Sequence, residues 1–88
     1  MSTIKQLRIL ETSLENVADA LGVRIPIPIR DRFEIIKMAA LTHLNRHNID
    51  QVNGNADMGK AASVEFRRLQ KKLTPRIIRL RTRLVNSS

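Results

Sequence analysis

Residues 60–84 of the chain, KAASVEFRRLQKKLTPRIIRLRTRL, carry two patterns at once. Apolar side chains recur every three or four residues, which is the spacing of one face of an α-helix. Lysine and arginine occupy many of the positions between them, so the opposite side of the same helix is basic. The stretch therefore predicts an amphipathic helix that packs against the rest of the protein on one face. That face comprises Ala62, Phe66, Leu69 and Leu73, and continues as Ile77, Leu80 and Leu84.

Pro75 divides this stretch and leaves two predictions open. A threonine followed by proline is typical of a helix start, since proline fits the first helical position. Proline inside a helix lacks the backbone donor and collides with the preceding turn. Phe66 and Ile77, like the next two pairs of the stripe, lie eleven residues apart, a repeat that stays nearly in phase along a straight helix. We favour a helix over about residues 56–73 with a break or strong kink at Pro75, and one long helix kinked there is the alternative.

A first helix is expected at the N-terminal end of the chain. Ser2 or Thr3 can cap its start, and Gly22 can end it in the left-handed conformation. Its apolar residues alternate at spacings of three and four and form a narrow heptad seam. The seam is interpreted as one face of an intramolecular bundle or as an interface with a second copy or another partner. Its residues are Leu7, Leu10, Leu14, Val17 and Leu21.

Residues 23–29, VRIPIPI, are expected to be an extended connector, because a residue that precedes proline avoids the α region. They pack across the helices or form an exposed docking strip. A second helix is expected to follow, with Asp31 as its N-cap and Glu34 completing a capping box.

The second helix is apolar over most of its circumference. A helix of this kind is central in its fold or contacts a second subunit. One face comprises Phe33, Ile36, Ala40 and Leu44, and the other side carries Ile35, Met38 and Ala39. After it, residues 48–55 are expected to form a loop with a turn at Asn53-Gly54.

These elements predict an all-α protein, a small three- to four-helix bundle or helical-hairpin array. The 88 residues are expected to form a single domain with a modest core. Only 2% of the residues are aromatic, and a chain rich in Leu, Ile, Ala, Arg and Lys favours helices over sheets. Within the domain, residues 1–59 are expected to form the core and residues 60–88 a basic helical element.

The whole net charge of +8 lies in the last third of the chain. Seven basic residues balance seven acidic ones in residues 1–59, whereas nine basic residues in residues 60–88 face Glu65 alone. Like charges four apart destabilise a helix, so folding gives no reason for this clustering. A polyanion does, because phosphates neutralised by Lys and Arg release condensed counterions. The residues expected to contact nucleic acid are Lys60, Arg67, Arg68, Lys71, Lys72, Arg76, Arg79 and Arg83.

The function expected from this charge is non-enzymatic, largely sequence-independent binding of nucleic acid by an oligomer. An acidic protein is the other expected partner. The competing class is a helical assembly or adaptor protein that docks through the heptad seam and the Ile-Pro strip. Arg81 falls inside the apolar stripe, where a buried arginine needs a partner. It either extends to the edge of the stripe or marks an interface.

Other kinds of chemistry are not expected. There is no cysteine, the three glycines are isolated, and no serine has a plausible His–Asp context. His43 and His47 share a helix face but lack further metal ligands, and residues 50–57 do not follow the order of a calcium loop. We expect no cofactor, no metal, no small-molecule substrate and no membrane. No secretory signal or membrane-spanning stretch is visible, which favours a cytoplasmic protein or a component of a particle assembled there.

Overall fold

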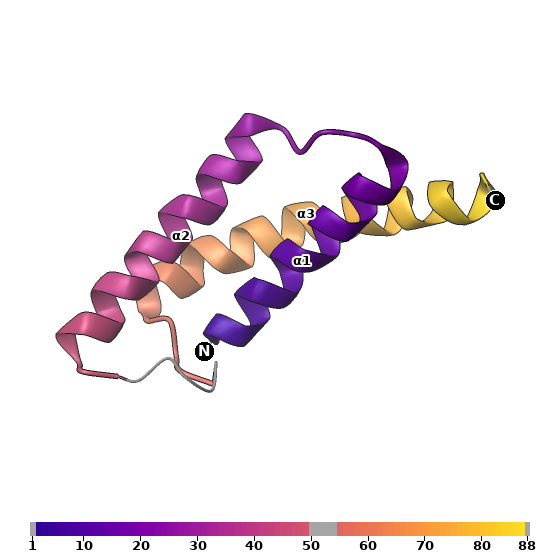
Figure 1. The fold of residues 1–88 in the computed structure, drawn as a ribbon. Helices are drawn as coiled ribbons and strands as arrows, with labels where there is room; N and C mark the ends of the chain where they lie inside the picture. Colours follow the sequence, from indigo (N-terminus) through magenta and orange to yellow (C-terminus); the bar gives the residue numbers. More distant parts are fainter. Residues whose placement is uncertain (1, 50–54, 88) are drawn as a thin grey trace.

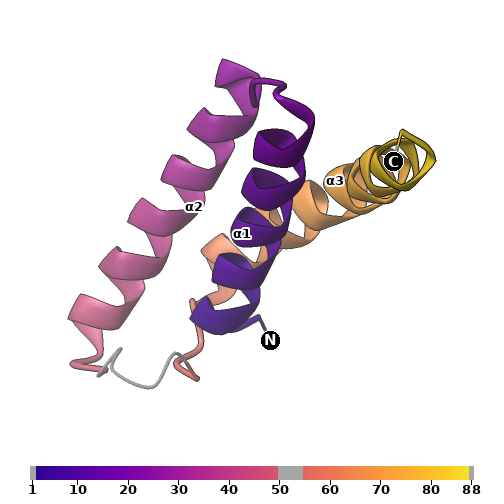
Figure 2. The same ribbon diagram turned by 45° about the vertical axis from the view of Figure 1, so that its right-hand side comes forward.

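Two antiparallel helices and a third that crosses them make up the fold (Figure 1). The computed structural model describes residues 2–49 and 55–87, and these contain the helices α1 (Ile4–Leu21), α2 (Ile27–Arg46) and α3 (Lys60–Asn86). Figure 2 shows α1 and α2 side by side, with α3 passing across them and extending beyond α1 at its C-terminal end. The all-α bundle is confirmed, whereas the turn predicted at Asn53-Gly54 lies outside the described residues.

The central helix is α3, because both α1 and α2 pack against it. The prediction that the second helix is central is therefore wrong. α2 buries only one face, and its other side is open, with Ile35 52% and Met38 68% exposed. Both predicted core faces are confirmed, except that Leu80 and Leu84 near the end of α3 are only half-buried. The buried set of α2 is Ile29, Phe33, Ile36, Ala40 and Leu44, and that of α3 is Ala62, Ser63, Phe66, Leu69, Leu73 and Ile77.

The heptad seam of α1 lies inside this single chain. Leu7, Leu10, Leu14 and Val17 are each at most 8% exposed, and Leu21 is half-buried. This corrects the assignment of the seam as an interface, because its surface is already covered within one molecule. The intramolecular interpretation of the seam accounts for its narrow shape, since α1 packs mainly on one neighbour, α3.

Both ends of α1 are formed as the sequence predicts. The Thr3 hydroxyl accepts the backbone N–H of Gln6 at 3.3 Å, and the Gln6 side chain accepts the N–H of Thr3 at 2.9 Å. These reciprocal bonds form a capping box. Gly22 ends the helix at φ 67°, and its N–H is directed to the carbonyls of Ala18 and Asp19.

α2 begins at Ile27, four residues before the predicted N-cap Asp31, so Asp31 does not cap it. The extended part of the connector is limited to residues 23–26, ending at Pro26 with φ −56° and ψ 141°. Pro28 lies in the first turn, where a helix has no intrahelical acceptor for the N–H that proline lacks. Pro26 and Pro28 thus lie at the start of the helix. The prediction that residues 27–29 are extended is therefore wrong.

α3 continues through Pro75 without a break, so the predicted break is wrong. The apolar stripe stays in phase across the proline, and Leu73 (0% exposed) and Ile77 (5% exposed) both enter the core. This packing on either side of Pro75 outweighs the local cost of the missing backbone donor. The Thr74 hydroxyl donates to the Gln70 carbonyl at 2.7 Å in the turn before it.

The start of α3 is fastened to the start of α1. The N–H of Ile4 donates to the Ala56 carbonyl, and that of Met58 donates to the Ser2 carbonyl, each at 3.1 Å. Met58 is fully buried beneath these bonds. The α3 helix thus begins at residue 60 rather than near residue 56, because residues 56–58 are used to pair with the N-terminal segment.

Candidate functional site

The basic residues predicted to contact nucleic acid all lie on α3 at the surface of the protein. Arg76 is half-buried and the other seven are exposed, namely Lys60, Arg67, Arg68, Lys71, Lys72, Arg79 and Arg83. α3 has 27 residues, which corresponds to a rod about 40 Å long. The fold therefore presents this charge on one long, continuous element.

Five of the eight residues form a single row on α3. They follow one another at spacings of four, four, three and four, which keeps them on one side of a helix. The distance from the first to the last is fifteen residues, or about 22 Å of helix. We call this row, which consists of Arg68, Lys72, Arg76, Arg79 and Arg83, the α3 stripe.

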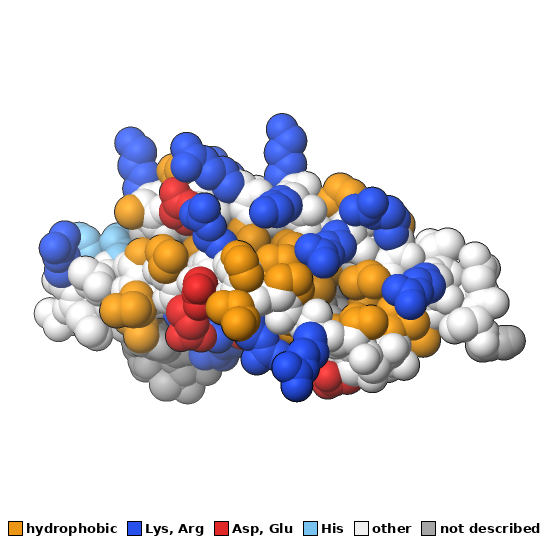
Figure 3. Space-filling model, turned by 90° about the horizontal axis from the view of Figure 1, so that it is seen from above, with side chains coloured by type: hydrophobic (Ala, Val, Ile, Leu, Met, Phe, Trp, Pro, Cys, Tyr) orange, Lys and Arg blue, Asp and Glu red, His pale blue; other side chains and the backbone are white. Residues whose placement is uncertain are grey.

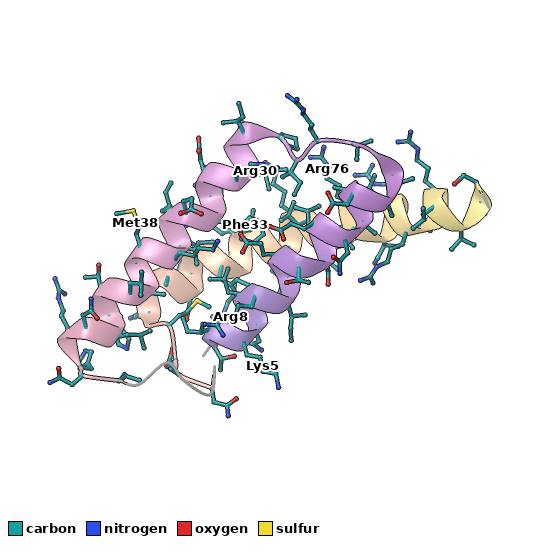
Figure 4. All side chains as sticks on the ribbon, in the orientation of Figure 1. Lys5, Arg8, Arg30, Phe33, Met38 and Arg76 are labelled. Carbon is teal, nitrogen blue, oxygen red and sulfur yellow. The ribbon has the colours of Figure 1, made fainter. Side chains whose placement is uncertain are left out.

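The α3 stripe borders the connector and the first turns of α2. One surface cleft along it brings Arg32 of α2 beside Arg68 and Lys72. A second cleft brings Arg24 of the connector beside Arg76 and Arg83. Figure 4 shows Arg30 and Arg76 at the same edge of the molecule, next to the connector. The α3 stripe together with Arg24 and Arg32 is called the basic track.

Arg67 and Lys71 lie off this track. At about 100° per residue they are turned roughly 100–140° around α3 from the middle of the α3 stripe. Lys60 is at the first turn of α3, where it borders a cleft with His43 and His47 of α2. The set predicted from the sequence is thus not one surface, because only its larger part faces α2.

Few carboxylates neutralise the basic track. Glu65 lies 3.3 Å from Arg68 and 3.6 Å from Arg32, so two arginines share one acidic group. Within residues 2–49 and 55–87, no carboxylate lies within 4 Å of the other track residues. Those other residues are Arg24, Lys72, Arg76, Arg79 and Arg83. The charge of the track is therefore largely uncompensated by the described fold.

No described carboxylate of α1 lies within 4 Å of a basic group of α3. Glu11 instead lies 2.9 Å from the ammonium of Lys37 on α2. The hydrogen bond to Glu11 raises the pKa of Lys37 above its usual value, and the nearby charge of Glu34 adds to this. This pair joins α1 to α2 on the side away from α3.

Figure 3 shows the face that includes the connector and the beginning of α2. Lysine and arginine side chains are spread over much of this face, with hydrophobic side chains and fewer acidic groups between them. Lys5 and Arg8, in contrast, lie near the N-terminal end of α1 (Figure 4). Basic residues thus lie both on this face and away from it, so charges in the two places can be removed separately.

Arg81 is exposed rather than buried in the apolar stripe, which agrees with the expectation that its side chain extends to the edge of the stripe. It borders a shallow cleft between α1 and α3 together with Ile9 and Ile78, whose side chains are 57% and 55% exposed. A contact of Arg81 with a partner stays a prediction.

The two histidines lie together near the end of α2. The ring centroids of His43 and His47 are 4.6 Å apart. Among the described residues, no group of three or more His, Cys, Asp or Glu side chains is placed to hold a metal ion.

Arg24 and Arg32 are the track residues that the sequence analysis missed. Residues 1–59 are neutral as a block, so their net charge gives no signal for Arg24 or Arg32. The spacing of the α3 stripe was a usable signal, since it singles out one side of the helix. That the connector and α2 border this side could be learned only from the packing.

Comparison of the chain with protein-family models, with curated proteins and with solved structures finds no match. In the described part of the chain, no helix combines the length and the apolar character needed to cross a membrane.

Proposed function

We propose that this protein is a non-enzymatic nucleic-acid-binding protein that contacts the phosphate backbone through the basic residues of α3. The observation that supports this most is the α3 stripe, five basic residues in a row, beside which the described residues place one carboxylate, Glu65, within 4 Å of Arg68. Binding of phosphates by these side chains releases counterions from the nucleic acid, and this release drives association. Arginine, which provides four of the five, also forms paired hydrogen bonds with phosphate oxygens.

The binding is expected to be largely independent of nucleotide sequence. Base edges are read in the grooves by side chains such as Asn, Gln and Arg that are held at defined positions. The α3 stripe contains no Asn or Gln, and its neighbours on the outer side of α3 include Pro75 and Thr82. Contacts to phosphate position a protein on nucleic acid without selecting a sequence.

Repulsion between the like charges of the α3 stripe destabilises the folded helix. This cost supports a functional reason for the stripe. Arg68 and Lys72, Lys72 and Arg76, and Arg79 and Arg83 are pairs of like charge four residues apart. Each such pair destabilises an isolated helix by a few tenths of a kcal/mol, roughly 0.2–0.5. A bound polyanion removes this repulsion.

Charge-matched variants test the proposal. The triple variant Arg68→Gln, Arg79→Gln, Arg83→Gln is compared with the control Lys5→Gln, Arg8→Gln, Arg46→Gln, which loses the same three charges elsewhere. On two labelled duplexes of unrelated sequence at low salt, we expect the α3 variant to bind at least about tenfold more weakly, and equally so on both. The control is expected to stay close to the wild type. Absence of wild-type binding at about 50 mM salt contradicts the proposal.

A second candidate function is that of a helical assembly protein that self-associates. The observation in its favour is the outer face of α2, where Ile27, Ile35, Met38 and Leu41 are 45–72% exposed. Asp31 and Glu34 lie on the same side of α2, so a second copy could approach there without meeting the basic α3. A small core of this kind often gains stability by association.

Sedimentation analysis tests this candidate. The wild type is expected to form a dimer, and the variant Ile35→Lys, Met38→Lys is expected to be monomeric. Ile9→Lys, Ile78→Lys, which alters the other exposed isoleucines, serves as the matched control and is expected to remain dimeric. A strictly monomeric wild type at high concentration would exclude the α2 face as a self-contact.

A further inference from the structure

We propose that the basic track, rather than α3 as a whole, is the surface that receives the phosphate backbone of a nucleic-acid duplex. This inference rests on the proposed function and makes it more specific. It adds Arg24 and Arg32, which lie outside α3, and it gives a minor role to Arg67 and Lys71. It also names a double strand, rather than a single strand, as the ligand.

The connector and α2 place two arginines beside the α3 stripe. Arg32 lines one cleft with Arg68 and Lys72, and Arg24 lines the next one with Arg76 and Arg83. Two adjacent segments that lie far from α3 in the sequence thus border the same edge of α3. Arg24 is exposed, and the side chain of Arg32 is 62% exposed, so both can reach a ligand that lies along α3.

The length of the α3 stripe is suited to contact with a duplex. It extends over about 22 Å. A strand of a DNA duplex presents one phosphate for about every 3.4 Å of its axis and winds around that axis. The α3 stripe therefore spans a rise of about six base pairs and meets the phosphates on the side of the duplex that faces it. A duplex holds these phosphates in a fixed array, and a row of basic residues on a continuous helix meets such an array without ordering it first.

The lack of exposed aromatic side chains favours a double strand over a single strand as the ligand. The chain has no Trp and no Tyr, and its two phenylalanines, Phe33 and Phe66, are 2% and 1% exposed. Proteins that bind single strands stack the bases on aromatic side chains, each stack contributing about 1–3 kcal/mol. A single strand would gain no such stacking here. Phosphate contacts, which the more densely charged duplex offers best, are what remains.

Two double variants test whether the track or the total charge of α3 matters. Arg24→Gln, Arg32→Gln removes two charges outside α3, and Arg67→Gln, Lys71→Gln removes two charges on α3 but off the track. On a labelled duplex, we expect the first pair to flatten the slope of log K against log salt by about 1.8, and the second by less than about 0.9. Circular dichroism and thermal unfolding establish that both variants remain folded.

Equal flattening by the two pairs, or a larger effect of the second, overturns the track while leaving the proposed function in place. Absence of wild-type binding overturns both. The failure of the inference and the failure of the function are thus distinguishable.

The type of strand is tested with the wild-type protein and ligands of equal length. A DNA duplex, an RNA duplex and an unstructured single strand are titrated at the same salt concentration. Tighter binding of either duplex than of the single strand is expected, and the better duplex identifies the source of the phosphate array. Binding of the single strand as tightly as the duplexes overturns the inference.

Discussion

Gly59 holds the backbone at the start of α3 in a conformation that other residues avoid. Its φ of 91° and ψ of 161° lie in a region that is essentially restricted to glycine. A Cβ atom there would lie 2.5 Å from Cγ of His43, so α2 closes off the space beside it. We expect Gly59→Ala to lower the free energy of unfolding by more than about 2 kcal/mol in urea titrations.

Gly22→Ala is the matched control for that prediction. Gly22 also has a positive φ, 67°, but nothing lies within 4 Å of a Cβ built there. Only the conformational cost of the left-handed region applies, which is about 1–2 kcal/mol. A loss at Gly59 no larger than that at Gly22 would show that the packing against His43 does not constrain the start of α3.

Lys37 makes the free energy of unfolding depend on pH in the alkaline range. Its folded-state pKa is raised by Glu11, so the pair contributes its full stability below the unfolded-state pKa of about 10.4. That contribution is lost as the pH rises through the folded-state value. The side chains are 38% and 23% exposed, so solvent screening limits the effect to less than about 1 kcal/mol.

The measurement is the difference in unfolding free energy between the wild type and Lys37→Gln as a function of pH. We expect this difference to be constant up to about pH 10 and to shrink above it. Lys5→Gln is the control, because within the described residues Lys5 has no carboxylate within 4 Å. A difference for Lys37 that grows above pH 10 would contradict the assigned role of the Lys37–Glu11 pair.

At the scale of the element, we expect the like charges of the α3 stripe to lower the stability of the free protein and to raise its affinity for a duplex. Lys72 lies four residues from both Arg68 and Arg76, so Lys72→Gln removes two repulsive pairs. We expect the free protein to gain about 0.5 kcal/mol of stability and to lose affinity for a duplex. Chemical unfolding and duplex titration of the same sample measure the two effects. A variant that loses both stability and affinity would contradict the repulsion in the α3 stripe.

The three helices differ in how well the sequence predicts their ends. Thr3 and Gly22 are local signals whose bonds lie within or next to α1, and both are confirmed. The start of α2 and the course of α3 past Pro75 depend on packing, because Ile29 and Ile77 are buried in the core. Rules for proline describe an isolated helix, and tertiary contacts overrode them in α3.

At the scale of the whole molecule, the sequence predicts the basic helix but not its neighbours. The charge of residues 60–88 and the apolar stripe of α3 follow from composition and spacing alone. That α3 is central, that the α1 seam is covered, and that Arg24 and Arg32 border α3 follow only from how the helices pack. These are long-range contacts, which no helical periodicity encodes.

The salt dependence of duplex binding tests the central claim most directly. Affinity of the wild-type protein for a labelled DNA duplex is measured at several salt concentrations, and log K is plotted against log salt. Seven contacts by the basic track predict a slope of about −6, since each phosphate contact on duplex DNA contributes about −0.9. A slope shallower than about −2, or no binding at about 50 mM salt, would contradict the account.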